Sequence, residues 1–461
     1  MKKLIKEILG LPEKQMNMIE HFETINDTDI LIILKKQTHR CPSCGEYTSY
    51  IKDYKIRKVS HNSLINRDTF LFYKCRRYLC KSCQISFVEN NPFTANRRTK
   101  VSSKSIINIL DDLKPYNETF SSVARRYNLS VTKVVELFDT HVQVQPKALT
   151  QHICIDEFYF NRHSKYKYAF MIMDFDKKLI LDIVKSRRYV ILYDYFFKKP
   201  SSQKKNVTHI CMDLYEGYRI LVSEIFPDAI ICADPFHVVK YINDALNAVR
   251  KRIMRKHAND KSSVEYNLLK CNHRILFKPK DYLDNQKYFF NKTLNYHTTE
   301  TGLLDQVLKV DDELKHAHAL KEMYYKFNEA TEDDLKDTEE SLKKTKKTKA
   351  ELHNERLDDI IEAMRNSQIN EFNRCANTLE KWKEEILNSF VWFDGRRFSN
   401  GVIEGKNNYI KKILNNANGF RNFERARNKI MYSQNKYERY SLSEYRTKKK
   451  KTNKKKKGTK K

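Results

Sequence analysis

The sequence lacks any run that approaches the ~20 consecutive apolar residues required for a membrane-spanning helix. Its opening, MKKLIKEILGLPEK, carries charge at Lys6 and a Gly-Leu-Pro break where a secretion signal would be apolar. It also has no internal repeat of fixed period. These absences predict a cytoplasmic protein that does not associate with membranes.

Acidic residues are in deficit, with 58 Asp and Glu against 88 Lys and Arg and a net charge of +30. Such an excess attracts a polyanion such as nucleic acid, or an anionic membrane surface. Eleven of the basic residues lie in residues 446–461, which we expect to form a disordered tail, so +19 remains on the rest of the chain. Alternatively, the abundance of Lys, Asn, Ile and Tyr reflects an AT-rich coding sequence, in which case charge alone identifies no partner.

The ten cysteines of this 461-residue chain do not indicate a disulfide framework, so clustered ones are better interpreted as metal ligands. Two C-x-x-C pairs occur in CPSC and CKSC, a spacing that points two thiolates at one tetrahedral ion. Cys75 either replaces a member of the second pair or is a buried thiol beside the site. The sequence therefore predicts a structural Zn²⁺ in a small module, residues 1–97. The predicted ligands are Cys41, Cys44, Cys80 and Cys83.

Residues 98–148 have helical spacing, and two helices flank the turn YNLS, in which Ser130 can act as N-cap. Ala124 before the turn and apolar residues after it (Val131, Val134, Val135 and Phe138) are typical of a helix-turn-helix. The pattern also fits any pair of packed helices. If it binds DNA, Thr132 and Lys133 at the start of the second helix are the candidate groove contacts.

The remaining chain is predicted to form a mixed α/β core with a large insertion. Residues 149–256 alternate as three strands, then helix, strand, helix, strand and helix, which favours a mixed sheet covered on both faces. Residues 257–390 have helical spacing and no strand signal, so we expect a helical insertion. Its segment 330–355 mixes both charge signs and is interpreted as a solvated face rather than a DNA contact. Residues 391–435 would complete the core, and residues 436–461 would form the basic tail.

Three dispersed acids can form a second metal site. Asp156 and Asp213 each follow an apolar strand pattern, and Glu404 opens a helix. Carboxylates at the ends of adjacent strands can converge, and three of them can hold two Mg²⁺ ions about 4 Å apart for phosphoryl transfer. The alternative is that Asp at a strand end only forms a turn or caps a helix.

Several blocks, in this order, resemble transposases of the ISL-three family of bacterial insertion sequences. They are CPSC…CKSC, SSVARRYNLS, IDEF, CMDLYEGYR, ADPFHVVKYINDALNAVRK and NGVIEGKNNYIKKI…NGFRNFERAR. The resemblance is thin in the insertion and absent in the tail. It implies a DDE transposase whose RNase H-like core follows a zinc-binding module and a helix-turn-helix. Asp156, Asp213 and Glu404 would then be the catalytic ligands of Mg²⁺ or Mn²⁺.

Asp234 and His237 belong to the block DPFH after the fifth strand, which resembles an acid-and-histidine motif near the active site of related transposases. We therefore expect an auxiliary role for both residues. Two alternatives stay open: Asp234 replaces Asp213 as the second metal ligand, or Asp234 only caps the following helix while His237 packs on its first turn.

Other residues around Glu404 are candidates for contacts. Asn408 follows it by four residues, shares its helix face and can contact DNA or a ligand water. Glu157 is left out, because alternation along a strand points it to the face opposite that of Asp156. A basic run beside this site fits phosphate contacts, or an ordinary solvated helix. The run consists of Lys406, Lys411, Lys412, Arg421 and Arg425.

The function hypothesis is a nucleoid-associated transposase that binds the inverted ends of its element. It would cleave a phosphodiester to release a 3′-OH and use that hydroxyl to attack target DNA. The expected partners are double-stranded DNA of the ends and target, and further copies of the chain, at least as a dimer. The alternatives are a DNA-binding regulator that lost catalysis and a structure-selective nuclease such as a junction resolvase.

Overall fold

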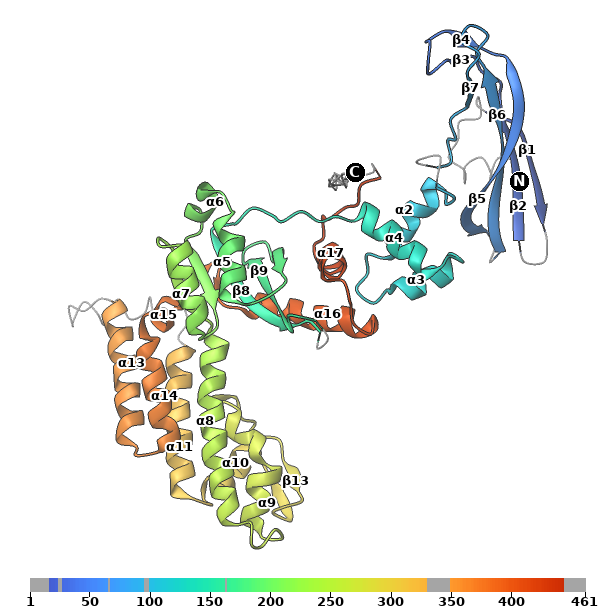
Figure 1. Cartoon of the computed structure of the whole chain (residues 1–461). Coiled ribbons are helices and arrows are strands. Elements are labelled where there is room, and N and C mark those ends of the chain that lie inside the picture. Colours follow the sequence, from blue (N-terminus) through green and yellow to red (C-terminus); the bar gives the residue numbers. More distant parts are fainter. Residues whose placement is uncertain are drawn as a thin grey trace, which may run out of the picture. The chain divides into compact units, whose positions relative to one another are not determined.

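The computed structural model describes residues 16–23, 27–64, 67–94, 99–161, 164–329 and 349–442 (Figure 1). The basic tail and most of the charged segment of the insertion lie outside these ranges. The chain forms two compact units, one of Met1–Gln145 with Asn408–Lys461, the other of Pro146–Asn407. Among the described helices, none combines the length and the apolar character needed to cross a membrane.

The first unit begins with a sheet that carries the cysteine pairs. Its strands are β1 (Met16–Glu23), β2 (Asp27–Leu34), β5 (Ile51–Leu64), β6 (Arg67–Leu79) and β7 (Ser86–Val88). Their order is β1-β2-β6-β5, with β7 also on β6, and β2 and β6 run parallel. The small strands β3 (His39–Arg40) and β4 (Tyr47–Thr48) pair separately. One face buries Ile30, Ile32, Val59, Leu71 and Tyr73, as the alternation of apolar residues along the strands requires.

The predicted helix pair is present as α3 (Phe120–Arg126) and α4 (Val131–His141), preceded by α2 (Ser103–Asp112). Ser130 is the N-cap of α4, and its side chain accepts a hydrogen bond from the Lys133 N–H. Val134 and Phe138 are buried as expected, but Val131 is 44% exposed because the first residue of the helix precedes its packed turn.

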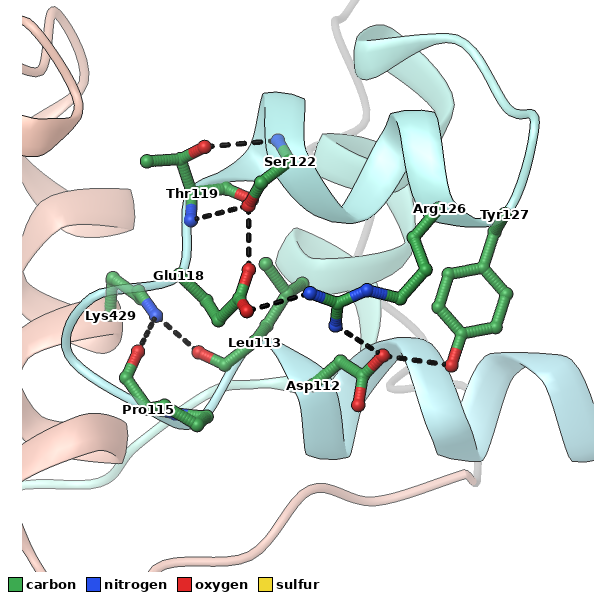
Figure 2. Close-up of polar contacts among 9 residues, drawn as sticks. All are labelled: Asp112, Leu113, Pro115, Glu118, Thr119, Ser122, Arg126, Tyr127 and Lys429. Carbon is green, nitrogen blue, oxygen red and sulfur yellow. Dashed lines mark hydrogen bonds and ion pairs between the residues drawn. The ribbon is translucent and has the colours of Figure 1, made fainter.

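A polar network fastens the start of α3 to α2 (Figure 2). Thr119 and Ser122 form a reciprocal capping box with two bonds of 3.0 Å. Arg126 donates to Asp112 and to Glu118, both at 2.7 Å. Because one guanidinium joins both carboxylates, the loop before α3 is held against α2.

The C-terminal helix α17 (Phe423–Gln434) packs with these helices. Lys429 is 2% exposed, and its ammonium donates to the carbonyls of Leu113 and Pro115, the latter at 3.0 Å (Figure 2). The Arg425 guanidinium pairs with Asp139 at 2.6 Å. Residues from Asn408 onward therefore group with the helix-turn-helix, whereas the sequence analysis assigned residues 391–435 to the catalytic core.

The second unit contains a five-stranded sheet in the order β10-β9-β8-β11-β12. Its strands are β8 (His152–Tyr159), β9 (Tyr168–Asp174), β10 (Leu179–Val184), β11 (His209–Met212) and β12 (Ile230–Ala233). The pairs β8–β9 and β9–β10 are antiparallel, and β11 runs parallel to both β8 and β12. The associated helices are α5 (Tyr189–Phe197), α6 (Ser201–Lys205), α7 (Glu216–Ile225) and α8 (Pro235–Lys256). The predicted order of strands and helices is confirmed, with α6 as an additional short helix.

The insertion is mainly helical, as predicted. It contains α9 (Val264–Cys271), η2 (His273–Phe277), η3 (Lys280–Tyr282), α10 (Glu300–Leu308), α11 (Asp312–Asn328), α13 (Lys349–Asn366), α14 (Asn370–Lys381) and α15 (Lys383–Asn388). The prediction that the insertion contains no strands was wrong. β13 (Phe289–Asn291) and β14 (Tyr296–Thr298) form a hairpin, whose strands are too short to show alternation in the sequence.

The helices α8, α11, α13 and α14 lie side by side (Figure 1). Arg252 of α8 joins two of them, with bonds of 2.6 Å to Glu313 and 2.9 Å to Glu371. One apolar core continues from the sheet into this bundle. After the bundle, β15 (Trp392–Phe393) and β16 (Arg396–Arg397) lead into α16 (Gly401–Asn416). The insertion therefore ends shortly before the helix that carries Glu404.

Candidate catalytic and zinc sites

The four predicted zinc ligands come together in the first unit. The sulfur atoms of Cys41, Cys44, Cys80 and Cys83 all lie within 4.8 Å of one another. The closest pairs join the two motifs, with Cys41 to Cys83 at 3.6 Å and Cys44 to Cys80 at 3.5 Å. Four thiolates grouped in this way are the donor set of a structural, closed zinc site.

Each C-x-x-C motif is followed by a residue in the left-handed region. Gly45 has φ 81° and Gln84 has φ 58°, and their N–H groups donate to the carbonyls of Cys41 and Cys80 at 3.0 and 2.9 Å. These turns direct backbone N–H groups at the sulfur atoms. The N–H of Cys83 is the main cause that lowers the pKa of Cys80 to about 6, which favours the metal-binding thiolate.

Cys75 is a buried thiol and not a member of the four-sulfur cluster. It lies in β6, 1% exposed, and its S–H donates to the Lys55 carbonyl at 3.0 Å. Burial raises its pKa, so the thiol form is favoured. Of the two interpretations left open by the sequence, the structure matches the buried thiol.

The predicted acids are brought together by the register of three parallel strands. Cys154, Cys211 and Cys232 are aligned across β8, β11 and β12. Two residues further along each strand stand Asp156, Asp213 and Asp234, which are therefore level with one another. The repeated Cys-x-Asp spacing in CID, CMD and CAD puts each acid on the same face as its cysteine.

Asp156 lies within β8 and not at its end, because β8 continues to pair with β9 as far as Tyr159. Asp213 directly follows β11, so its parallel pairing with β8 stops before this level. Burial, and then the negative charge of Asp213, raise the pKa of Asp156 to about 7. The two carboxylates are thus close enough for strong repulsion, which a cation between them would relieve.

Asp234 and His237 join the same cluster. Asp234 is fully buried and is the N-cap of α8, where it accepts from the His237 N–H at 3.3 Å and from His237 Nδ1 at 2.7 Å. His237 Nδ1 also lies 3.0 Å from Asp213 Oδ1. The helix cap considered as an alternative in the sequence analysis is therefore present. In addition, each of Asp213, Asp234 and His237 offers a ligand atom within 4.8 Å of the others.

The ring of His237 is held as a cation by the two acids. Burial alone would lower the pKa of His237, but the hydrogen bonds that its ring donates to Asp213 and Asp234 outweigh burial and raise the pKa to about 10. At neutral pH the ring therefore carries a proton that Asp213 and Asp234 both accept. His237, held by Asp234, thus orients the Asp213 side chain.

Glu404 lies in the first turn of α16, between two asparagines in the sequence that contact the aspartates. Four residues before it, the Asn400 amide donates to Asp213 Oδ1 at 3.3 Å. Three residues after it, the Asn407 amide donates to Asp156 Oδ2 at 2.9 Å. Positions spaced by four and three residues share one helix face, so Glu404 stands on the stripe between these two contacts.

The sequence analysis missed Asn400 and Asn407 and chose Asn408, which is exposed on α16. The signal was available, because residues four before and three after Glu404 share its face. Glu157 was correctly left out of this face: it accepts from the Tyr218 hydroxyl and pairs with Arg187.

The DNA-contact candidates lie in varied surroundings. Thr132 is exposed, and Lys133 pairs with Glu136 at 3.1 Å. Lys411, Lys412 and Arg421 are exposed, and Lys412 lies over the rings of Tyr116 and Tyr409. Lys406 is half-buried, which lowers its pKa, and Arg425 is engaged by Asp139.

A mixed sheet with aligned acids, joined to a four-cysteine module, defines a DDE-type transposase domain with a zinc ribbon. The family model for the ISL3 transposase DDE domain matches residues 153–430, more than half of the chain. A second model, the zinc finger of the transposases IS204/IS1001/IS1096/IS1165, matches residues 37–83. The chain belongs to the ISL3 transposase family, as the sequence motifs predicted.

Individual relatives carry the same description. The transposase for insertion sequence element IS1557 of two Mycobacterium tuberculosis strains is 31% identical over 114 residues, 25% of each chain. The transposase for element IS1001 of Bordetella parapertussis is 21% identical over 252 residues, 54% of this chain and 60% of its own length. The matched part spans between a quarter and three fifths of these relatives.

Proposed function

We propose that the protein is a DNA transposase that cleaves DNA at the ends of an insertion sequence and joins the freed end to target DNA. Supporting this, the chain belongs to a transposase family and its acids are level across β8, β11 and β12. The strand order β10-β9-β8-β11-β12, antiparallel in its first part and parallel in its second, is that expected of an RNase H-like core.

Asp156, Asp213 and Glu404 are the proposed ligands of two divalent cations, Mg²⁺ or Mn²⁺. Their donor atoms fit, because carboxylate oxygens are the ligands that these hard ions prefer. The charge of Asp213 also contributes, after burial, to the raised pKa of Asp156. Such ions would polarise the scissile phosphate and activate a water or a 3′-OH. The protein side chains hold the ions, orient the DNA and keep Asp213 in place through His237.

Asp213 is favoured over Asp234 as the second ligand. Both oxygens of Asp234 are already engaged, Oδ1 by the Asn400 N–H at 2.9 Å and Oδ2 by His237. Asp234 is also fully buried, whereas the Asp213 side chain is 21% exposed. Asp213 can therefore reach a phosphate-bound ion, and Asp234 acts as a support.

The helix-turn-helix and the zinc-binding module are proposed to bind double-stranded DNA, with Thr132, Lys133, Lys411, Lys412 and Arg421 as contacts. Lys406 and Asn408 would lie close to the cleaved strand, since they flank Glu404 on α16. Bringing two ends together requires at least a dimer on DNA. A protein of this activity would work in the cytoplasm, on the nucleoid.

The test is cleavage of a labelled duplex carrying the element's own end, with Mg²⁺ or Mn²⁺, alongside a binding assay. We expect Asp156→Asn, Asp213→Asn and Glu404→Gln each to lower the cleavage rate by ~10³-fold or more, with DNA affinity within about twofold of wild type. Asp234→Asn should reduce the rate less, since it is a support.

The outcome separates the alternatives. A wild-type protein that binds the end but does not cut it in the presence of any divalent ion would be a DNA-binding regulator. Preference for branched DNA over the element's end would indicate a structure-selective nuclease. If Asp234→Asn is as inactive as Glu404→Gln while Asp213→Asn still cuts, the assignment of the second ligand is reversed.

A further inference from the structure

Two asparagines on either side of Glu404 make the contacts between α16 and the aspartates. The Asn400 amide donates to Asp213 Oδ1 at 3.3 Å and to the Ile155 carbonyl at 3.1 Å, and its main-chain N–H donates to Asp234 Oδ1 at 2.9 Å. Asn400 thus contacts the middle of β8 and the residues that directly follow β11 and β12. Its side chain is 1% exposed.

Asn407 makes the corresponding contact on the other side. Its amide donates to Asp156 Oδ2 at 2.9 Å. Since Asn400 binds the Asp213 carboxylate and Asn407 binds that of Asp156, the helix carrying Glu404 is fastened at two points, one turn before and one turn after the acid.

Two of the cysteines that precede the acids by two residues form hydrogen bonds to the chain segment before α16. The Cys154 thiol donates to the Ser399 carbonyl at 3.5 Å, and the Cys232 thiol donates to the Asn388 carbonyl at 3.3 Å. Both thiols are fully buried. These two bonds hold the segment before α16 against the sheet, in a position from which Asn400 contacts Asp213.

Each of the two asparagines also has a buried side-chain oxygen that is available for a further hydrogen bond. The Oδ1 atoms of Asn400 and Asn407 are buried and accept no hydrogen bond from the described residues. A buried amide oxygen of this kind is costly unless it is paired, and a water bound to a cation is a suitable donor.

We propose that Asn400 and Asn407 are positioning residues that set the affinity of the acidic site for divalent cations. They act through Asp213 and Asp156, whose carboxylates they orient, and through Glu404, whose helix they fasten. The inference rests on the proposed metal-binding role of these three acids. Outer partners of metal ligands typically change metal affinity or activity ~10–100-fold when removed.

The test measures Mn²⁺ binding to the full-length protein without DNA, by electron paramagnetic resonance, and cleavage on the same preparations. Asn400→Ala and Asn407→Ala should each raise the Mn²⁺ dissociation constant about 10-fold, with cleavage partly restored at high Mn²⁺. DNA affinity should stay within about twofold of wild type. Asn407→Gln, which keeps the amide donor, should recover most of the affinity.

The matched control is Asn206→Ala. The Asn206 amide also donates to a main-chain carbonyl, that of Leu149 at 3.2 Å, but contacts none of the acids. Because Asn206 is exposed and distant from the acids, this variant should leave Mn²⁺ binding unchanged. If Asn400→Ala fails to fold, Asn400→Leu keeps a similar side-chain volume, loses the donor, adds no charge and gives the same readout.

Two results would overturn the inference. Unchanged Mn²⁺ affinity in both alanine variants, with binding lost in Asp156→Asn, would remove the positioning role and leave the proposed function intact. Wild-type protein whose Mn²⁺ binding is the same as that of Asp156→Asn would overturn the metal role of the acids, and the inference with it.

Discussion

At the scale of single residues, the acidic site is governed first by the burial of Asp156 and then by the negative charge of the neighbouring Asp213. Burial and the charge of Asp213 raise the pKa of Asp156 to about 7, whereas in the unfolded chain this carboxyl has its ordinary value near 3.8. The folded state therefore holds a proton that the unfolded state has lost between pH ~4 and ~7. Stability contributed by protonated Asp156 is present at low pH and decreases as the pH rises through 7.

This predicts that Asp156→Asn raises the melting temperature at pH 8 by about 3 °C without added divalent ions, and changes it little at pH 4. His237 stays protonated over this range, because its pKa is about 10. Added Mg²⁺ should stabilise the wild type more at pH 8 than at pH 5.5, since the cation competes with the proton. The measurement is a thermal melt at each pH.

The control is Asp194→Asn, which removes an exposed carboxylate that pairs with Lys198 on the protein surface. It should show no such pH dependence. Equal melting temperatures of Asp156→Asn and the wild type at pH 8 would show that the two carboxylates do not repel each other as strongly as proposed.

At the scale of secondary-structure elements, α17 completes the helix-turn-helix from the far end of the sequence. The Lys429 ammonium of α17 donates hydrogen bonds to two carbonyls at the end of α2, which would otherwise require water. Burial lowers the pKa of Lys429 to about 8. The Tyr432 hydroxyl also donates to the Leu110 carbonyl at 3.1 Å. The helices that we propose to bind DNA therefore depend on residues some 300 positions away.

We expect Lys429→Met to destabilise the first unit by about 1–3 kcal/mol, because two buried carbonyls lose their donor. DNA affinity should fall in proportion to the unfolded fraction, whereas Mn²⁺ binding, which depends on the second unit, should not change. Denaturant unfolding and a DNA-binding assay measure both effects. Lys436→Met, at an exposed position, is the control, and a loss of stability as large as that of Lys429→Met would contradict the role of burial.

At the scale of the whole molecule, the zinc site and the acidic site belong to different compact units. Replacing Cys80 and Cys83 by Ser should therefore abolish the bound zinc and weaken binding to the element's end by ~10-fold or more, because the small module loses its metal crosslink. Binding of Mn²⁺ should be unaffected. Metal analysis by mass spectrometry and the resonance assay distinguish the two ions.

Cys75→Ala provides the comparison, since Cys75 lies outside the four-sulfur cluster. It should lower stability through lost packing and still retain one zinc per chain. Loss of zinc in this variant would place Cys75 among the ligands after all.

Local sequence determined much of this protein. The two C-x-x-C pairs define the zinc ligands because the turn that presents them is made by adjacent residues. The strands and helices of the sheet were predicted because their apolar periodicity is a local property, and the acids could be placed because each follows its own strand pattern. The pairing of β2 with β6 was not predicted, since it joins segments about 40 residues apart.

Only the tertiary structure decided which side chains meet. Strand register aligned Asp156, Asp213 and Asp234 across three strands. The packing of the segment before α16 brought Asn400 and Asn407, and not Asn408, into contact with the acids. Packing likewise assigned α17 to the helix-turn-helix and not to the core. The contacts of Asn400, Asn407 and Lys429 join residues 166 to 316 positions apart. Their geometry depends on strand register and on buried surfaces, which no local pattern contains.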